Sequence, residues 1–215
     1  MNWKRKVFEN FRLYTVTDLR SEESGLDRKI EAAYRGGADI VQLRARGLTD
    51  GELYRIGLRL RRIANRFRRL FFVNDRPDLA LAVEADGVHL GQDDLPMTAV
   101  RKILKGKNCF VGRSTHSLSQ ALQAVREGVD YIGVGPVFKT PTKPHCQPVG
   151  LELVQAVSRR VRIPFVCIGG IDPTHVRQVM EAGGRRVAVV RAVFEAPDVY
   201  QAVKSLREVL DSYEK

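Results

Sequence analysis

The chain has 215 residues, a formal net charge of +11 at pH 7, 44% hydrophobic residues and 7% aromatic residues. This length suits one sizeable core, and single α/β barrels commonly fall in this range, so we expect one domain. The positive charge favours anionic partners. However, the excess arginines gather on a helical segment, residues 55–69, and few aromatic residues accompany them, which argues against a nucleic-acid-binding surface.

Three scattered cysteines, Cys109, Cys146 and Cys167, lack the spacing of a disulfide framework or a zinc site and fit a reducing compartment. The N-terminal segment is too short and too charged for a signal sequence, and no later run reaches the length of a membrane span. We therefore expect a soluble cytoplasmic protein that binds small molecules rather than nucleic acid or membranes. A homo-oligomer is left open.

Short apolar runs alternate with segments of helical periodicity along the whole chain, which predicts repeated βα units and a parallel sheet. Apolar residues at helical spacing begin after Thr49 or Asp50, and similar stripes occupy 27–35, 117–127, 150–160 and 173–182. The uninterrupted series predicts an α/β fold, a single-domain (β/α)8 TIM barrel over residues 1–215. The predicted strands are 11–16, 39–43, 69–73, 86–90, 110–113, 130–135, 164–168 and 186–190.

Residues 1–10 are interpreted as an N-terminal extension of the barrel. Its apolar side chains, Trp3, Val7 and Phe8, are expected to cap the lower end, where the strands begin.

In such a barrel the carboxyl ends of the strands carry the chemistry. Polar residues follow nearly every predicted strand, whereas the opposite ends are expected to show no such clustering. The residues in question are Gln42, Arg44, Arg46, Asn74, Asp75, His89, Gln92, Asp93, Asp94, Arg113, Ser114, Thr115 and Arg191.

The loop after the sixth strand is rich in donors for anionic oxygens. It contains Lys139, Thr140, Thr142 and Lys143, between prolines that restrict its conformations, and therefore predicts a phosphate or pyrophosphate site. The pair Gly169-Gly170 after the seventh strand could be only a tight turn. Its position favours a phosphate-binding role, because backbone N–H groups there commonly hold a phosphate in barrel enzymes.

Two carboxylates at neighbouring strand ends, Asp75 and Asp94, suit a hard cation such as Mg²⁺. The competing interpretation of Asn74-Asp75 is a turn or a helix N-cap. Asp93 is expected to be a solvated or capping residue.

Arg44 and Arg46 alternate along one strand end, so their side chains point the same way. They can bind phosphate oxygens, or they can pair with a neighbouring acid such as Asp75 or Asp94. The residues leave these alternatives open.

The four histidines are assigned no acid or base role. His89 is expected to be a structural group at the barrel rim, while His116, His145 and His175 occupy loop or helix-start positions without a visible partner.

Taken together, the motifs resemble those of the thiamine-phosphate synthase family across nearly the whole chain. They are Tyr14-Thr-Val-Thr-Asp18, Val41-Gln-Leu-Arg44, Asn74-Asp75, Ala85-Asp-Gly-Val-His-Leu-Gly-Gln-Asp-Asp94, Asp130-Tyr-Ile-Gly-Val-Gly-Pro136, Thr140-Pro-Thr-Lys143 and Ile168-Gly-Gly-Ile171.

The resemblance implies a Mg²⁺-dependent transferase of thiamine biosynthesis. It would join 4-amino-2-methyl-5-pyrimidinylmethyl diphosphate to a thiazole phosphate and release pyrophosphate. It implies metal ligation by Asp75 and Asp94, and catalytic roles for Lys143, Ser114 and Arg46. It further implies that the substrates are bound by Gln42, Arg44, Arg46, Asn74, Ser114, Thr140, Thr142, Lys143, Gly170, Val190 and Arg191.

This chain departs from the family pattern at two positions. Arg46 stands where a lysine is usual, and Arg191 stands where a serine is usual, so Arg191 could bind the thiazole phosphate or crowd it. Two alternatives follow: a thiazole tautomerase on the same barrel, or a non-catalytic regulator that binds thiazole or phosphate. The paired carboxylates and the Thr-Pro-Thr-Lys loop favour the synthase.

Overall fold

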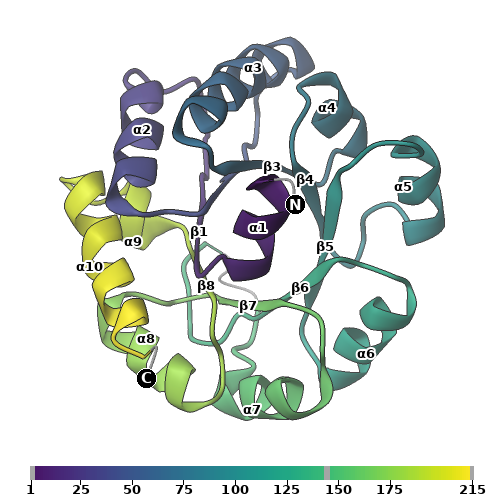
Figure 1. The fold of residues 1–215 in the computed structure, drawn as a ribbon, viewed down its shortest axis with the longest axis vertical. Coiled ribbons are helices and arrows are strands. Elements are labelled where there is room, and N and C mark those ends of the chain that lie inside the picture. The colour runs from purple at the N-terminus through teal and green to yellow at the C-terminus, as the bar shows by residue number, and fades with distance from the viewer. Residues whose placement is uncertain (1–2, 143–145, 214–215) are drawn as a thin grey trace.

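The computed structural model describes residues 3–142 and 146–213. Eight parallel strands close into a barrel in sequence order, and β8 pairs with β1 (Figure 1). The predicted (β/α)8 barrel is confirmed, and every strand lies within two residues of its predicted bounds. The strands are β1 (Leu13–Val16), β2 (Ile40–Leu43), β3 (Leu70–Asn74), β4 (Gly87–Leu90), β5 (Phe110–Thr115), β6 (Tyr131–Val134), β7 (Phe165–Ile168) and β8 (Val187–Val189).

Helices surround the barrel, apart from the first, which lies across its opening (Figure 1). Within the described residues, none is long and apolar enough to cross a membrane. The helices are α1 (Trp3–Asn10), α2 (Leu26–Gly36), α3 (Asp50–Phe67), α4 (Pro77–Ala82), α5 (Met97–Ile103), α6 (Leu118–Arg126), α7 (Gly150–Arg160), α8 (Pro173–Glu181), α9 (Arg191–Phe194) and α10 (Val199–Asp211).

The strands are buried on both faces, and their alternation divides the core into two clusters. Along β2, Val41 and Leu43 belong to the outer cluster beneath the helices, while Ile40 belongs to the cluster inside the barrel. Tyr14 and Phe72 also belong to the inner cluster. This arrangement follows from the two-residue period of a strand in a parallel sheet covered on both sides.

The N-terminal helix α1 closes the end of the barrel where the strands begin. Phe8 is 3% exposed, and its ring stacks on Phe110 with a centroid separation of 3.8 Å. Trp3 and Val7 pack against the same inner cluster. The predicted capping by these apolar residues is therefore confirmed.

The boundary of α3 is set by a capping box at Thr49. The Thr49 hydroxyl accepts a hydrogen bond from the Glu52 backbone, and the Glu52 carboxylate accepts one of 2.7 Å from the Thr49 backbone N–H. Two orphan donors at the helix start are satisfied in this way. The helix begins at Asp50, so Thr49 is the cap of the two predicted candidates.

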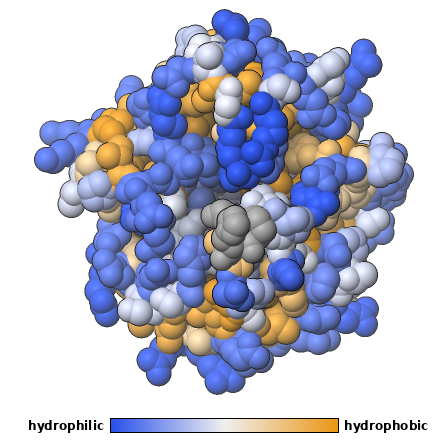
Figure 2. Space-filling view, turned by 180° about the vertical axis from the view of Figure 1, so that it is seen from behind, coloured by the Kyte–Doolittle hydropathy of each residue, from blue (hydrophilic) through white to orange (hydrophobic). Residues whose placement is uncertain are grey.

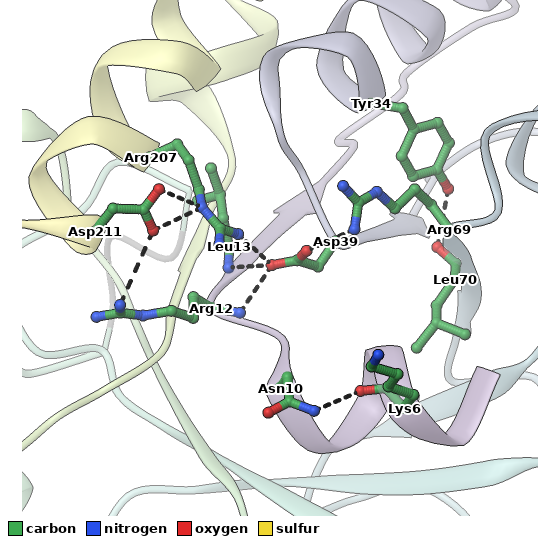
Figure 3. A network of polar contacts seen from close by, with 10 residues as sticks. All are labelled: Lys6, Asn10, Arg12, Leu13, Tyr34, Asp39, Arg69, Leu70, Arg207 and Asp211. Atoms are coloured by element: carbon green, nitrogen blue, oxygen red, sulfur yellow. Dashed lines mark hydrogen bonds and ion pairs between the residues drawn. The ribbon is translucent and has the colours of Figure 1, made fainter. Parts of the chain in front are cut away.

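A buried carboxylate organises the amino end of β2 (Figure 3). Asp39, which is 5% exposed, accepts hydrogen bonds through Oδ2 from the backbone N–H groups of Arg12 and Leu13, at 2.8 and 3.2 Å. The guanidinium groups of Arg207 and Arg69 donate to its two oxygens at 2.9 and 3.1 Å. The carboxylate thus joins α10 to the first three strands.

A second buried carboxylate joins distant segments at the amino end of β4. Asp86 forms ion pairs with Arg61 of α3 and, at 2.8 Å, with Lys4 of α1. It also accepts a hydrogen bond of 2.9 Å from the Phe71 backbone N–H. The prediction that the lower ends lack polar clusters is therefore wrong. Each carboxylate is isolated in the sequence, and distant segments supply its partners.

Candidate active site

A cavity of about 640 Å³ opens where the strands end, on the face of the barrel opposite α1. Figure 2 views this face and shows hydrophilic side chains gathered around its centre. The volume is typical of a site for small molecules. The lining includes Gln42, Arg44, Asn74, His89, Ser114, His116, Lys139, Thr140, Thr142, Gly170, Asp172, His175, Val190, Arg191 and Glu195.

Most of the described residues predicted to bind substrate line this cavity, whereas Arg46 and the two predicted metal ligands, Asp75 and Asp94, do not appear in its lining. Lys143 lies outside the described residues. Arg46, Asp75 and Asp94 lie at the ends of the same strands and outside the lining. The structure therefore brings most of the predicted substrate-binding side chains together at the mouth of the barrel, while Arg46, Asp75 and Asp94 lie outside the lining.

Arg44 and Arg46 share one carboxylate, that of Asp18 in the loop after β1. Arg44 Nη1 is hydrogen-bonded to Asp18 Oδ1, and Arg46 Nη2 lies 3.3 Å from each Asp18 oxygen. The arginines thus pair with a neighbouring acid, Asp18, which the sequence did not indicate as their partner, and the Asp75 charge also acts on Arg44. A carboxylate directly after the neighbouring strand was the signal that could have identified Asp18.

The backbone holds this arrangement in register. Thr17 Oγ1 donates a hydrogen bond of 2.9 Å to the Arg44 carbonyl and accepts one of the same length from the Arg44 N–H. Leu19 and Ala45 continue the β1–β2 pairing as an isolated bridge. Burial lowers the pKa of the Arg44 guanidinium, although the nearby Asp18 charge acts in the opposite direction. Arg44 is a partly desolvated cation, which strengthens its attraction for an anionic ligand.

His89 is held by hydrogen bonds on both ring nitrogens. Nδ1 lies 2.9 Å from the Tyr131 hydroxyl, and Nε2 lies 3.0 Å from Ser114 Oγ. The expectation of a satisfied structural histidine at the barrel rim agrees with these contacts. The ring also lines the cavity, and its hydrogen bond to Ser114 was not evident from the sequence.

Two other histidines have partners that the sequence did not reveal, so the expectation of no partner is wrong for them. The His116 ring contacts the Gly135 carbonyl, and His175 Nδ1 lies 3.0 Å from Asp172 Oδ1. The His175 ring also packs on Phe138 at a centroid separation of 4.4 Å. Both histidines line the cavity. His145 lies outside the described residues.

Asp172 caps helix α8 beside the cavity. Its carboxylate accepts hydrogen bonds from the backbone N–H groups of Thr174 and His175, at 2.9 and 3.2 Å. Burial acts to raise the pKa of Asp172, but the Thr174 hydrogen bonds and the neighbouring His175 lower the pKa below its ordinary value. The cap is thus a stable anion at neutral pH.

The two glycines after β7 are required by the packing of their turn. Gly169 and Gly170 have φ values of 104° and 66°, in the left-handed region that favours glycine. A Cβ atom on Gly169 would lie 2.5 Å from Pro136 Cα, and one on Gly170 would lie 2.6 Å from the Lys139 carbonyl oxygen. The turn therefore packs directly against the loop after β6, which carries the predicted phosphate donors.

Asp75 and Asp94 are anchored to the same short segment, residues 89–91 at the end of β4. The Asp75 N–H donates to the His89 carbonyl at 2.8 Å, and Asp94 Oδ2 accepts a hydrogen bond of 2.6 Å from the Gly91 N–H. Asp75 has a φ of 62°, uncommon for a residue with a side chain. Among the described residues, no group of three or more His, Cys, Asp or Glu side chains could hold a metal ion.

Arg191 begins α9 at the edge of the cavity, and Glu195 holds its side chain. Arg191 Nε donates to Glu195 Oε2 at 2.7 Å, one helical turn further on. The Arg191 guanidinium is thus paired with Glu195 at the cavity lining. Glu195 belongs to the lining as well, and no sequence motif pointed to it.

The fold and the cavity together define a (β/α)8-barrel enzyme with its ligand site at the carboxyl ends of the strands. Residues 13–193 match the family model described as thiamine monophosphate synthase, and the chain belongs to this family. The predicted membership, including assignment to the transferases, is confirmed.

Several curated relatives and a solved structure are similar over nearly their whole lengths. The thiamine-phosphate synthase of Thermus thermophilus is 47% identical, with 93% of this chain and 97% of that protein covered. That of Chloroflexus aurantiacus is 45% identical, with 94% and 93% covered. The structure of a thiamine phosphate pyrophosphorylase from Pyrococcus furiosus superposes with a TM-score of 0.86 at 38% identity, covering 95% of this chain and 98% of that one.

Proposed function

We propose that this chain is a thiamine-phosphate synthase that joins 4-amino-2-methyl-5-pyrimidinylmethyl diphosphate to a thiazole phosphate. The C–O bond to the diphosphate breaks, a C–N bond to the thiazole forms, and pyrophosphate leaves. The observation that carries the proposal is the cavity itself, because side chains from the family motifs on β2, β3, β5 and the loops after β6 to β8 meet around it.

The diphosphate is proposed to bind on the side of the cavity formed by β2, β3 and β5. Arg44 supplies a partly buried cation there, pre-positioned by Asp18. Asn74 and Ser114 add uncharged polar groups, and Gln42 lies on the wall between the diphosphate and the barrel interior. Arg46, at the margin and paired with the same Asp18, is proposed to contribute from outside the lining.

The thiazole phosphate is proposed to bind on the opposite side, between the loops after β6, β7 and β8. Thr140 and Thr142 provide hydroxyl groups, and Gly170 presents its backbone without a side chain in the way. Val190 and Arg191 complete this wall. Glu195 accepts a hydrogen bond from Arg191 and would hold its guanidinium in place beside the ligand.

Magnesium fits the oxygen donors after β3 and β4. Mg²⁺ usually takes one or two protein carboxylates and completes its shell with water and substrate phosphates, which suits two aspartates that both bond to the end of β4, Asp75 through its N–H and Asp94 through its carboxylate. Asp75 and Asp94 would hold the ion. When bound, the ion would neutralise charge that develops on the departing pyrophosphate.

The chain's own residues support a dissociative substitution. As the C–O bond breaks, negative charge grows on the pyrophosphate, and preorganised cations such as Arg44 stabilise it. Lys143, from the loop after β6, is proposed to act in the same way. The aminopyrimidine delocalises the positive charge left on its methylene carbon. The thiazole nitrogen then attacks, and because it carries no proton to remove, the site needs no general base.

The alternatives considered from the sequence are not favoured. A tautomerase or a binding protein would have no need of the paired carboxylates at β3 and β4 or of a donor-rich loop at β6. The relatives that match at 45–47% identity are named as synthases.

The proposal is tested by measuring thiamine phosphate formation from both substrates, with and without Mg²⁺, using plain and carboxylated thiazole phosphate. We expect metal-dependent product. Asp94→Ala should lower the rate by about 100-fold or more, since one such electrostatic contact contributes roughly 3 kcal/mol. The exposed neighbour Asp93 provides the matched control, and Asp93→Ala should remain active. Absence of product with either thiazole would contradict the assignment.

A further inference from the structure

Five side chains form a continuous hydrogen-bonded chain beneath the cavity, which we call the interior relay: Gln42, Tyr14, Tyr131, His89 and Ser114. Gln42 Nε2 lies 2.6 Å from the Tyr14 hydroxyl, which lies 3.1 Å from the Tyr131 hydroxyl. Tyr131 lies 2.9 Å from His89 Nδ1, and His89 Nε2 lies 3.0 Å from Ser114 Oγ. The relay crosses the barrel interior from β2 to β5, and both of its ends line the cavity.

The barrel is built around the middle of this relay. Tyr14 and Tyr131 are 2% and 0% exposed, and their rings pack edge-on or tilted against Phe72. Gly112 leaves room for the Tyr131 ring, because a Cβ atom on Gly112 would collide with it. Any side chain larger than glycine at this strand position would displace the Tyr131 hydroxyl from the relay.

Both tyrosines are neutral hydroxyl groups at physiological pH. Burial raises the pKa of Tyr14 and the pKa of Tyr131 well above the ordinary tyrosine value. Each hydroxyl therefore has one proton to donate and can accept hydrogen bonds as well.

The amide of Gln42 sets the direction of donation, because its nitrogen can only donate. Tyr14 accepts from Gln42, so its own proton must go to Tyr131, which is its other hydrogen-bond partner among the described residues. Tyr131 then donates to His89 Nδ1. In the reverse direction the buried Tyr14 proton would lack an acceptor, which is costly in an apolar interior.

From this geometry we infer that Tyr14 and Tyr131 are positioning residues that hold His89 with its proton on Nε2 rather than Nδ1, and that His89 in turn positions Ser114. His89 then donates to Ser114 Oγ, and Ser114 keeps its own proton to donate into the cavity. That the recipient is the diphosphate substrate rests on the proposed function. The direction of the relay does not depend on it.

The tautomer can be measured by ¹H–¹⁵N correlation NMR of the imidazole rings, with the His89 signals assigned by their loss in His89→Gln. We expect a protonated Nε2 and an unprotonated Nδ1 in the resting protein. In Tyr131→Phe, Nδ1 loses its donor, and the two nitrogen signals should move towards an averaged mixture of tautomers. A protonated Nδ1 in the unaltered protein, or an unchanged tautomer in Tyr131→Phe, would overturn the inference.

Tyr34→Phe is the matched control for removing a buried hydroxyl. Tyr34 is 3% exposed, and its hydroxyl donates to the Leu70 carbonyl at 2.9 Å, outside the relay. This variant should leave the His89 signals unchanged. A change as large as that in Tyr131→Phe would show that the His89 tautomer responds to general loosening of the core, and would overturn the role of the relay.

Activity supplies a second readout. Tyr131→Phe should reduce kcat/KM for thiamine phosphate formation by about tenfold, the value of one hydrogen bond, while Tyr34→Phe should not. His89→Gln retains an N–H donor that can reach Ser114 and should keep more activity than His89→Leu. Equal losses in these two variants would contradict the positioning role. Because the NMR result requires no turnover, failure of the proposed reaction and failure of the relay are distinguishable.

Discussion

Asp39 accepts a hydrogen bond of 2.9 Å from Arg207 of α10, which lies 168 residues further along the chain. The same carboxylate holds the backbone at the start of β1. One buried side chain thus joins the last helix to the first two strands (Figure 3). We expect this contact to stabilise closure of the barrel.

Asp39→Ala should lower the free energy of unfolding by about 3 kcal/mol, because it leaves backbone donors and guanidinium groups without their acceptor. Denaturant titration followed by circular dichroism measures the change. The control is Asp78→Ala, which removes an exposed carboxylate paired with Arg76 at 2.7 Å and should cost less than about 1 kcal/mol. Equal costs for the two variants would contradict a special role for Asp39.

Asp18→Ala should reduce kcat/KM for thiamine phosphate formation by about tenfold while the protein stays folded. Without Asp18, the guanidinium groups of Arg44 and Arg46 lose the contact that orients them, and preorganised charge is lost. Steady-state kinetics measures the effect. Asp27→Ala, which removes a partner of Arg59 instead, is the control. Higher activity in Asp18→Ala would mean that Asp18 competes with the diphosphate for the arginines.

Thr49→Ala should destabilise the protein by about 1 kcal/mol at neutral pH, because the capping hydrogen bond to α3 is lost. Thr49→Ser retains the hydroxyl and should remain close to the unaltered protein. Both are measured by thermal unfolding. Loss of stability in Thr49→Ser equal to that in Thr49→Ala would argue against the cap.

The contribution of the Thr49 cap to stability should depend on pH. Hydrogen bonds from Thr49 lower the pKa of Glu52 below its ordinary value of 4.5. A carboxylate whose pKa is lower in the folded state stabilises the protein at pH values above its unfolded-state pKa. This contribution is lost as the pH falls through its folded-state pKa. The difference in stability between the unaltered protein and Thr49→Ala should therefore shrink as the pH falls below 4.5. A difference that grows instead would contradict this sign.

Thiol reactivity should divide the cysteines into two groups. Burial raises the pKa of Cys109 and of Cys167 to about 12, so roughly one thiol in 10⁴ is the reactive thiolate at pH 8. Cys146 is exposed. Alkylation of the native protein at pH 8, followed by mass spectrometry, should modify Cys146 alone, and denaturant should expose the others. Rapid native modification of Cys167 would show that its strand opens readily.

The sequence by itself determined where the strands lie and that they form a barrel. Apolar periodicity and the residues that interrupt it are local properties, and eight consecutive βα units have few ways to close. Because parallel strands end on the same side, the sequence also indicated several residues of the cavity lining, including Gln42, Asn74 and Ser114.

Only the tertiary structure decided which side chains meet. Asp18 pairs with Arg44, and Tyr131 joins His89 to Tyr14 across the barrel. These partners lie on different strands, and their contact depends on the closure of the sheet and on the space left by residues such as Gly112. Periodicity shows which way a side chain faces, but the distance between two side chains is set by how the whole barrel packs.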